Sequence, residues 1–438
     1  MPKSRVRRKP RPPESSIPER PAWTRRWIDW IARFLAFRAA DAAMPPLPRP
    51  GLSHVAAAVV AASAFALVHG AIAWHMFTLE GNDYITHVGM AEALYRRGEI
   101  IMPHFLYHLL IAGAYAAHLT SSFLLAARLV VVGAYALTGA AVYGALWVVF
   151  HGDRRIGRAP ILLAATGALL VAQPIQHTLW VQIGYLWNDP YNAPTYTLTR
   201  SFAVGAFFLT VRFLFGRRRP GWRILIVFFL TVAAGALAKP SYLICLLPAA
   251  ALLALLRILR RAAVSPGALL IGLALPACAV LAWQYRHAFS GNPSLTEYQD
   301  TIVWAPLRVM RHWATDLEWK FLASTAFPLA VLLLHWKTAL RDGMLQLAWL
   351  TFFFGASYAY LLSETIRWTH GNFIWSAYIS LSVLSIASMI FWLRQVSAAP
   401  RGSWLWLREL ACLGVLSAHV IAGVAMDKHY LRFALDRF

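Results

Sequence analysis

The chain alternates between long apolar segments and shorter polar ones over most of its length. Eleven apolar segments approach or exceed the length of about 20 residues that a helix needs to cross a bilayer. They are residues 53–77, 123–150, 159–174, 200–215, 222–237, 240–256, 268–285, 321–336, 345–362, 373–393 and 405–425. This pattern predicts an all-α polytopic membrane protein with about 11 transmembrane helices.

The first long polar interruption follows the first apolar segment and covers residues 81–119. Two helices are expected within it. Asn82 or Asp83 can cap the first, which should end near Gly98, and Pro103 suits the first turn of the second.

The second of these helices, residues 104–119, is apolar enough to suggest another span. If it crossed, the basic segment 151–158 would lie on the opposite side from the basic N-terminus. We therefore expect a juxtamembrane helix on the outer surface. With 11 spans, about 28 of the 41 Lys and Arg and about 7 of the 19 Asp and Glu lie in the cytoplasm. The N-terminus is then expected inside and the C-terminus outside.

Composition supports a membrane protein. Of the 438 residues, 59% are hydrophobic and 14% are charged, whereas soluble proteins have about 25% charged residues. The net charge of +22 would favour nucleic acid in a soluble protein, but here the basic residues lie between apolar segments, so no nucleic-acid partner is expected.

Residues 22–40 have the pattern of an interfacial helix on an anionic leaflet, or of a helix packed on the rest of the protein.

Several motifs of soluble enzymes are absent from the sequence. Cys245, Cys278 and Cys412 have no paired spacing, so neither a disulfide nor a zinc site is predicted. There is no Walker A loop, GxGxxG, HExxH, GxSxG or DxD motif. Neither a nucleotide nor a nucleotide sugar is therefore indicated, and no metal ligands are assigned.

Asp83 is the first candidate for chemistry. It closely follows the first span, and His87 lies four residues further, on the same face of a helix starting there. A carboxylate at this position can accept a proton from a hydroxyl group. The alternative is that Asp83 only caps the helix, a role that Asn82 can also fill.

His104 and His108 stand one helical turn apart, with a tyrosine between them. Such a pair can bind a metal ion if a third ligand is present, and the spacing fixes none. The alternative interpretation places both histidines on the wet face of an amphipathic helix.

A third set of candidates consists of cations and polar residues at the expected outer ends of the spans. Each cation either binds an anion such as a lipid phosphate or serves as an interfacial anchor. The residues are Lys239, Arg200 and Arg367, with Glu364, His370, Asn372 and, in the second outer loop, Asp189.

The order of these features resembles the GT-C class of integral-membrane glycosyltransferases, which includes the dolichyl-phosphate-mannose protein mannosyltransferases and the bacterial aminoarabinose transferases. The likeness covers roughly residues 53–261. It depends on Asp83 directly after the first span, on the proline, Leu/Tyr-rich helix and Arg-containing span of residues 103–150, and on the step Ala238-Lys239-Pro240. Many members carry an adjacent acidic pair in the first loop, whereas this chain has a single Asp83 preceded by Asn82.

The resemblance implies an inverting transfer of a sugar from a polyprenyl-phosphate or diphosphate carrier to an acceptor on the extracytoplasmic face. It implies that Asp83 is the general base and that His87 orients it or touches substrate. Lys239, Arg200 and Arg367 would neutralise the departing lipid phosphate. The expected partners are the lipid-linked donor and membrane lipids, the expected location is the inner membrane of a bacterium, and the need for a divalent cation stays open.

We expect three parts: a basic cytoplasmic segment (1–50), a GT-C-like catalytic module (51–261) and additional transmembrane helices (262–438). Two other functions stay open. A surface-polysaccharide polymerase or ligase would use a late outer loop, here residues 287–320 with Arg308, Arg311 and His312. A transporter or non-catalytic scaffold would place ionisable groups in mid-membrane, whereas almost every carboxylate here lies in an expected loop.

Overall fold

The computed structural model of the chain describes most of the sequence after residue 50. The described residues are 51–78, 83–151, 159–176, 184–186, 191, 193–216, 221–289, 301–398 and 406–435. They all belong to one compact unit, residues 39–438. The interfacial helix expected at residues 22–40 and the candidate Asp189 lie outside the described residues.

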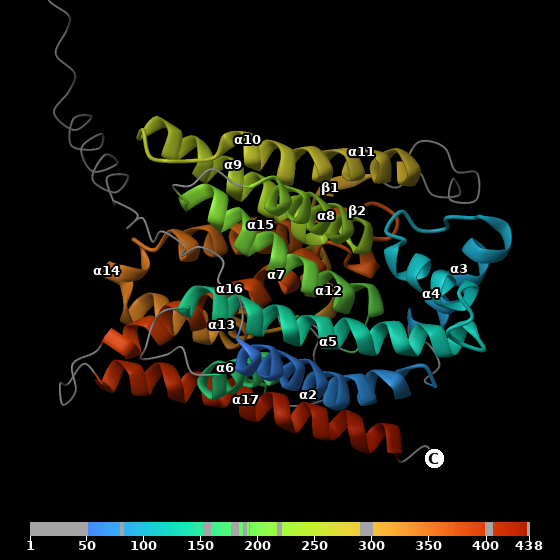
Figure 1. Cartoon of the computed structure of the whole chain (residues 1–438), viewed down its shortest axis with the longest axis horizontal. Helices are drawn as coiled ribbons and strands as arrows, with labels where there is room; N and C mark the ends of the chain where they lie inside the picture. Colours follow the sequence, from blue (N-terminus) through green and yellow to red (C-terminus); the bar gives the residue numbers. More distant parts are fainter. Residues whose placement is uncertain are drawn as a thin grey trace, which may run out of the picture. The chain divides into compact units, whose positions relative to one another are not determined.

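Helices dominate the described chain, and this confirms the prediction of an all-α polytopic membrane protein. Within the described ranges, nine helical segments are long and apolar enough to cross a membrane (Figure 1). They are formed by α2 (Leu52–Met76), α5 (Phe123–Phe150), α7 (Pro194–Phe215), η1 with α9 (Pro240–Tyr242 and Leu243–Leu259), α10 with η2 and α11 (Pro266–Leu269, Leu270–Ala274 and Leu275–Phe289), α13 (Leu317–Leu334), α15 (Gly343–Leu361), η3 with α16 (Trp368–His370 and Ile374–Ala398) and α17 (Trp406–Leu435).

The remaining elements are shorter. They are α3 (Asp83–Arg97), α4 (Leu106–Ala116), α6 (Ala159–Val171), α8 (Trp222–Ala238), α12 (Arg308–Trp313), α14 (Trp336–Ala339) and the strands β1 (Ile302–Trp304) and β2 (Leu362–Glu364). The strands pair in antiparallel fashion, with Ile302 opposite Glu364. This pairing fastens the segment before α12 to the connection between α15 and α16.

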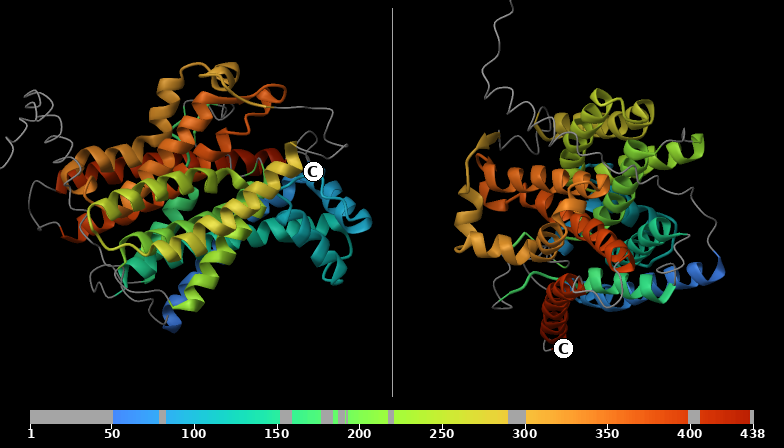
Figure 2. Two further views of the ribbon diagram at one scale, coloured as in Figure 1. Left: turned by 90° about the horizontal axis from the view of Figure 1, so that it is seen from above. Right: turned by 90° about the vertical axis from the view of Figure 1, so that its left-hand side faces the viewer.

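The loops that the charge pattern assigns to one side of the membrane gather at one end of the helix bundle, which we call the α3/α4 end (Figures 1 and 2). There the Gln284 side chain of α11 donates hydrogen bonds to the backbone oxygens of Pro103 (3.2 Å) and Ala236 (2.8 Å). At the opposite end, the Ser265 amide donates to the Phe213 carbonyl (3.0 Å). That the α3/α4 end faces outward stays a prediction from charge.

Two of the eleven expected spans, α6 and α8, are shorter than the others. α8 still crosses the bundle, whereas α6 ends early. α8 has 17 residues and connects the end where α7 stops to the α3/α4 end, so it crosses the bundle. α6 has only 13 residues, and helix was expected as far as residue 174. It stops at Val171 because Pro174 disfavours helical geometry at the residue before it.

The non-helical chain after α6 is stabilised by its neighbours. Gln173 is buried, its amide donates to the His419 carbonyl of α17 (3.0 Å), and the His419 side chain pairs with the Gln173 oxygen (2.8 Å). The Ile175 amide donates to the Ala323 carbonyl of α13 (3.3 Å). Irregular backbone at membrane depth is tolerated only when protein supplies such partners, and here α13 and α17 do so.

Helices α2 and α5 pack closely because their contact face carries small residues. A Cβ at Gly139 would lie 2.9 Å from the Ala61 carbonyl oxygen, so the backbones meet without intervening side chains. Close approach through small residues is typical of helix pairs in lipid, where apolar burial drives little association. This pair carries α3 and α4, which follow α2 and precede α5, and so positions the candidate site.

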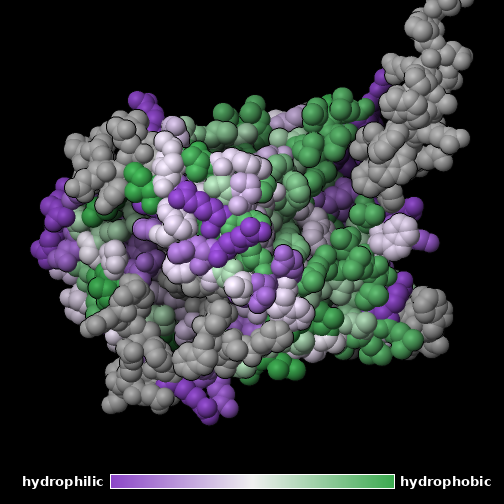
Figure 3. Space-filling model, turned by 180° about the vertical axis from the view of Figure 1, so that it is seen from behind, coloured by the Kyte–Doolittle hydropathy of each residue, from purple (hydrophilic) through white to green (hydrophobic). Residues whose placement is uncertain are grey.

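Large apolar side chains cover much of the outside of the helices. Leu67 of α2, Leu230 of α8 and Ile421 of α17 are 74%, 59% and 69% exposed. On one face, hydrophobic side chains form broad areas separated by a hydrophilic zone (Figure 3). Exposed apolar areas of this kind indicate contact with lipid rather than water.

Candidate functional site

Asp83 is the first residue of α3, seven residues after Met76 ends α2, and its side chain is exposed. It is therefore part of the helix rather than the residue that precedes it, and its negative charge is favourable at a helix N-terminus. The alternative cap, Asn82, lies outside the described residues. The carboxylate of Asp83 interacts electrostatically with the ammonium group of Lys239. Two residues that are distant in sequence are thus near enough at the α3/α4 end for their charges to interact.

Three histidines, His87, His104 and His108, form a cluster beside this pair. His87 of α3 and His108 of α4 are buried, and their rings stack with 2.7 Å between His87 Nδ1 and His108 Nε2. The expectation that His108 lines a wet helix face is therefore wrong. His104 is half-buried and lies before α4, which begins at Leu106, so the expected helical spacing of His104 and His108 is also wrong.

Burial lowers the pKa of all three histidines, because an imidazolium loses its hydration there. The pKa of His104 falls to about 3 and that of His108 to about 4. Burial and, to a smaller extent, charge interactions with His108, His104 and Lys239 lower the pKa of His87 well below its usual value. The cluster is consequently neutral at pH 7, and one ring of the His87–His108 pair must donate a proton to the other.

Lys239 lies in an extended turn between α8 and η1, where Pro240 ends the helical run. Burial lowers its pKa from 10.5 to about 8, and the Asp83 carboxylate opposes that shift. Its Nζ atom lies 4.0 Å from the centre of the Trp375 ring of α16, a favourable cation–π distance. The ammonium group is thus partly desolvated, lies over an aromatic face and interacts electrostatically with a carboxylate.

Arg200 is connected to this group through two aromatic rings. The Trp375 ring packs against that of Tyr196 at 5.4 Å between centroids, and the Arg200 guanidinium lies 5.9 Å from the centre of the Tyr196 ring. Helix α7 begins at Pro194, six residues before the expected start, so Arg200 lies inside the helix rather than at its entrance. Sequence reasoning missed Tyr196, although its position one turn before Arg200 was a usable signal.

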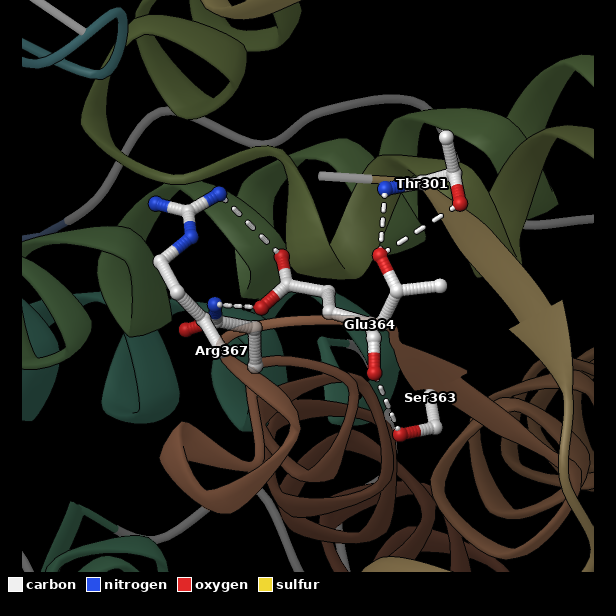
Figure 4. A network of polar contacts seen from close by, with 6 residues as sticks. Thr301, Ser363, Glu364 and Arg367 are labelled. Atoms are coloured by element: carbon white, nitrogen blue, oxygen red, sulfur yellow. Dashed lines mark hydrogen bonds and ion pairs between the residues drawn. The ribbon is translucent and has the colours of Figure 1, made fainter. Parts of the chain in front are cut away.

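Glu364, Arg367 and Asn372 form a second group at the start of η3 and α16. The Asn372 amide donates to Glu364 Oε2 (2.7 Å), and an Arg367 nitrogen lies 3.5 Å from Glu364 Oε1. Figure 4 shows Arg367 reaching toward Glu364, with Thr301 directly before the neighbouring strand β1. His370 lies in the same connection and is exposed. The structure therefore brings these predicted residues together, but as an ion-paired network separate from Asp83.

A third polar group was not expected from the sequence. His69 of α2, Tyr191 and Asp427 of α17 are buried together; the Tyr191 hydroxyl donates to Asp427 Oδ1 (2.6 Å), and His69 Nδ1 lies 3.6 Å from that oxygen. The expected last span ended at residue 425, whereas α17 continues to Leu435 and carries Asp427 inside the helix. Its partners come from three elements distant in sequence, so no local pattern could have indicated the group.

Among the residues that the structure describes, no group of three or more His, Cys, Asp and Glu side chains could hold a metal ion. The chain matches no protein-family model, no curated protein and no solved structure. The geometry of the residues themselves is thus the basis for any functional proposal.

We expect acid to destabilise the protein through the histidine cluster. Between pH 6.5 and about 4 the unfolded chain binds protons that folded His108 cannot, so stability falls as the pH is lowered through this window. The contribution of His108 alone between pH 7 and pH 5 is about 2 kcal/mol. Thermal unfolding at the two pH values would measure it. The variant His108→Gln should show a smaller pH effect, and His118→Asn, at an exposed histidine, the full effect; equal pH dependence in His108→Gln would contradict the prediction.

Proposed function

We propose that the protein is an inverting glycosyltransferase that moves a sugar from a polyprenyl-phosphate carrier to an acceptor at the extracytoplasmic face. The observation that carries the proposal is the electrostatic interaction between exposed Asp83 and half-buried Lys239 at the α3/α4 end. A general base and a cation for the leaving phosphate are the two groups that such a transfer needs close together.

The surroundings of the two residues suit these roles. Asp83 is exposed and can reach an acceptor hydroxyl. The ammonium of Lys239 is partly desolvated, which strengthens its attraction for a phosphate. The neutral histidine cluster adds hydrogen-bonding atoms without adding charge that would compete with Lys239 for the anion. His87, paired with His108, would support Asp83 from the same helix.

The other predicted cations support the proposal to different degrees. Arg200 is half-buried and reaches the same aromatic pair, Tyr196 and Trp375, that borders Lys239. It is therefore suited to a second phosphate contact. Arg367 is 3.5 Å from the Glu364 carboxylate, which already neutralises much of its charge. We assign Arg367, with Glu364, Asn372 and His370, to shaping this end of the protein rather than to the leaving group.

The experiment that tests the proposal uses the purified full chain in lipid nanodiscs with polyprenyl monophosphates carrying radiolabelled hexoses. We expect release of polyprenyl phosphate by wild type and a loss of kcat/KM of about tenfold or more in Lys239→Met. The matched control Lys337→Met removes an exposed lysine of α14 and should behave as wild type. Wild-type turnover should fall as the pH rises through about 8, because Lys239 then loses its charge.

The proposal would be contradicted if neither wild type nor any variant released sugar from donors carrying neutral, amino or acidic hexoses. Equal turnover by wild type and Lys239→Met would remove Lys239 from the site. Turnover restricted to diphosphate-linked oligosaccharides would favour the polymerase or ligase alternative.

One observation favours the transporter alternative. Glu409 and Asp427 are buried within α17, each beside a histidine: His335 lies 3.4 Å from Glu409, and His69 lies 3.6 Å from Asp427. Ionisable groups inside spans mark ion or proton pathways in many transporters. The expectation that nearly all carboxylates lie in loops is therefore incomplete. Ion flux in proteoliposomes that Asp427→Asn abolishes would support transport.

A further inference from the structure

A hollow of about 720 Å3 lies between the start of α12, the start of α13 and the end of α15. We call it the third-loop hollow. Its volume falls within the range of pockets that bind small molecules. It shares no lining residue with the Asp83–Lys239 site. The lining residues are Leu307, Arg311, Ala314, Thr315, Asp316, Leu317, Glu318, Phe321, Leu322 and Tyr360.

Two lining residues hold the backbone in an unfavourable conformation. Leu307 has φ 61° and Asp316 has φ 54°, in the left-handed region that non-glycine residues seldom adopt. Leu307 directly precedes α12, and its amide donates to the Tyr360 carbonyl (2.6 Å). Asp316 directly precedes α13. Such strain persists only where the surroundings enforce it, and it gathers at binding sites.

A further signal is the Tyr360 hydroxyl, which is buried and has no hydrogen-bond partner among the described residues. Buried polar atoms are nearly always paired, so this one is an exception, and it belongs to a residue that lines the hollow. The Glu318 carboxylate interacts electrostatically with Tyr360. The Tyr360 ring also packs against Phe321 at 6.3 Å between centroids, so an aromatic surface and polar groups share one wall.

The mixture of groups identifies the class of ligand. The lining contains one guanidinium, from Arg311, and two carboxylates, from Asp316 and Glu318, so its net charge is negative and disfavours a phosphate or another anion. The polar half of the lining does not suit an acyl chain. A sugar ring has hydroxyl groups that bond to carboxylate, guanidinium and tyrosyl groups, and C–H faces that pack on aromatic rings.

We propose that the third-loop hollow binds a neutral saccharide. The aromatic wall of Phe321 and Tyr360 contacts the C–H face of a sugar ring, and Tyr360, Glu318 and Arg311 bond its hydroxyl groups. The proposal does not depend on glycosyl transfer at Asp83: a transferase, a polysaccharide ligase and a sugar transporter could each use such a site.

The test is saturation-transfer NMR with the purified full chain in nanodiscs and two probes, maltotriose and triacetylchitotriose, at about 5 mM, since millimolar dissociation constants suit a site of this kind. At least one probe should bind wild type. Tyr360→Phe and Glu318→Gln should each weaken that binding about tenfold. Tyr358→Phe, which removes a hydroxyl two residues away on α15 that bonds Ile244, should change it less than about twofold.

The outcomes separate this site from the proposed active site. Asp83→Asn should retain full saccharide binding even if it abolishes transfer. Absence of binding by wild type to either probe, or undiminished binding by both hollow variants, would overturn the proposal. Displacement of the saccharide by inorganic phosphate would show an anion site instead.

Discussion

Asp83→Asn is expected to lower sugar transfer at least about a hundredfold, the usual contribution of a positioned general base. The amide keeps the size and helix-start position of the side chain but cannot accept the proton of the acceptor hydroxyl. It also removes the negative charge that supports protonation of Lys239. Initial rates with saturating lipid-linked donor, compared at pH 7, would measure the effect.

The matched control is Glu92→Gln, on the same helix. Glu92 is an exposed carboxylate whose partner is Arg96, 2.7 Å away, so its loss should cost less than about 1 kcal/mol and leave turnover unchanged. Unfolding temperatures of both variants should match that of wild type. If Asp83→Asn retains wild-type turnover, Asp83 is only a favourable residue at the start of α3, and the proposed mechanism loses its base.

Gly423→Ala is expected to be the most damaging single methyl addition in the described structure. A Cβ at Gly423 would lie 1.6 Å from the carbonyl oxygen of Val171, the last residue of α6. Neither side of this clash is a flexible side chain, so α17 and the end of α6 must separate. We expect a loss of about 3 kcal/mol or more, and an apparent Tm lower by roughly 5 °C or more at fixed scan rate.

Gly414→Ala provides the control on the same helix. Nothing lies within 4 Å of a Cβ at Gly414, so alanine there should be neutral or slightly stabilising, as helix propensity favours it. Similar Tm values for the Gly423 and Gly414 variants would show that α6 and α17 do not approach as closely as described.

The membrane-spanning helices were predictable because each one is a continuous apolar segment that can be recognised without its neighbours. Length and apolar content alone located the nine long spans. The charge pattern predicted that α4 does not cross the membrane, and its length of 11 residues agrees with this. The end of α6 was not predictable to the same degree. Its chain continues without helix because His419 and Ala323, more than a hundred residues later, supply the hydrogen bonds.

Only part of the candidate site was predictable, because local sequence identifies polar residues at the ends of spans but not the distant residues that contact them. Asp83, His87 and Lys239 stood out by chemistry at the ends of spans, and the structure brings them together. Trp375, which covers the ammonium group, is one of 19 tryptophans in an apolar chain, and nothing local distinguishes it. Gln284 was overlooked because it lies in an apolar segment, although it joins the stretch before α4 to the end of α8.

The positions of Gln284 and Trp375 have a consequence for the division of the chain at residue 261. A fragment ending there would keep Asp83, the histidines and Lys239. It would lose the Gln284 amide, which donates hydrogen bonds to both Pro103 and Ala236, and the Trp375 ring, which contacts the lysine. Because the later helices supply part of the surroundings of the earlier residues, we expect that neither half folds as a self-sufficient module. Any chimera that exchanges the C-terminal helices must carry both side chains with it.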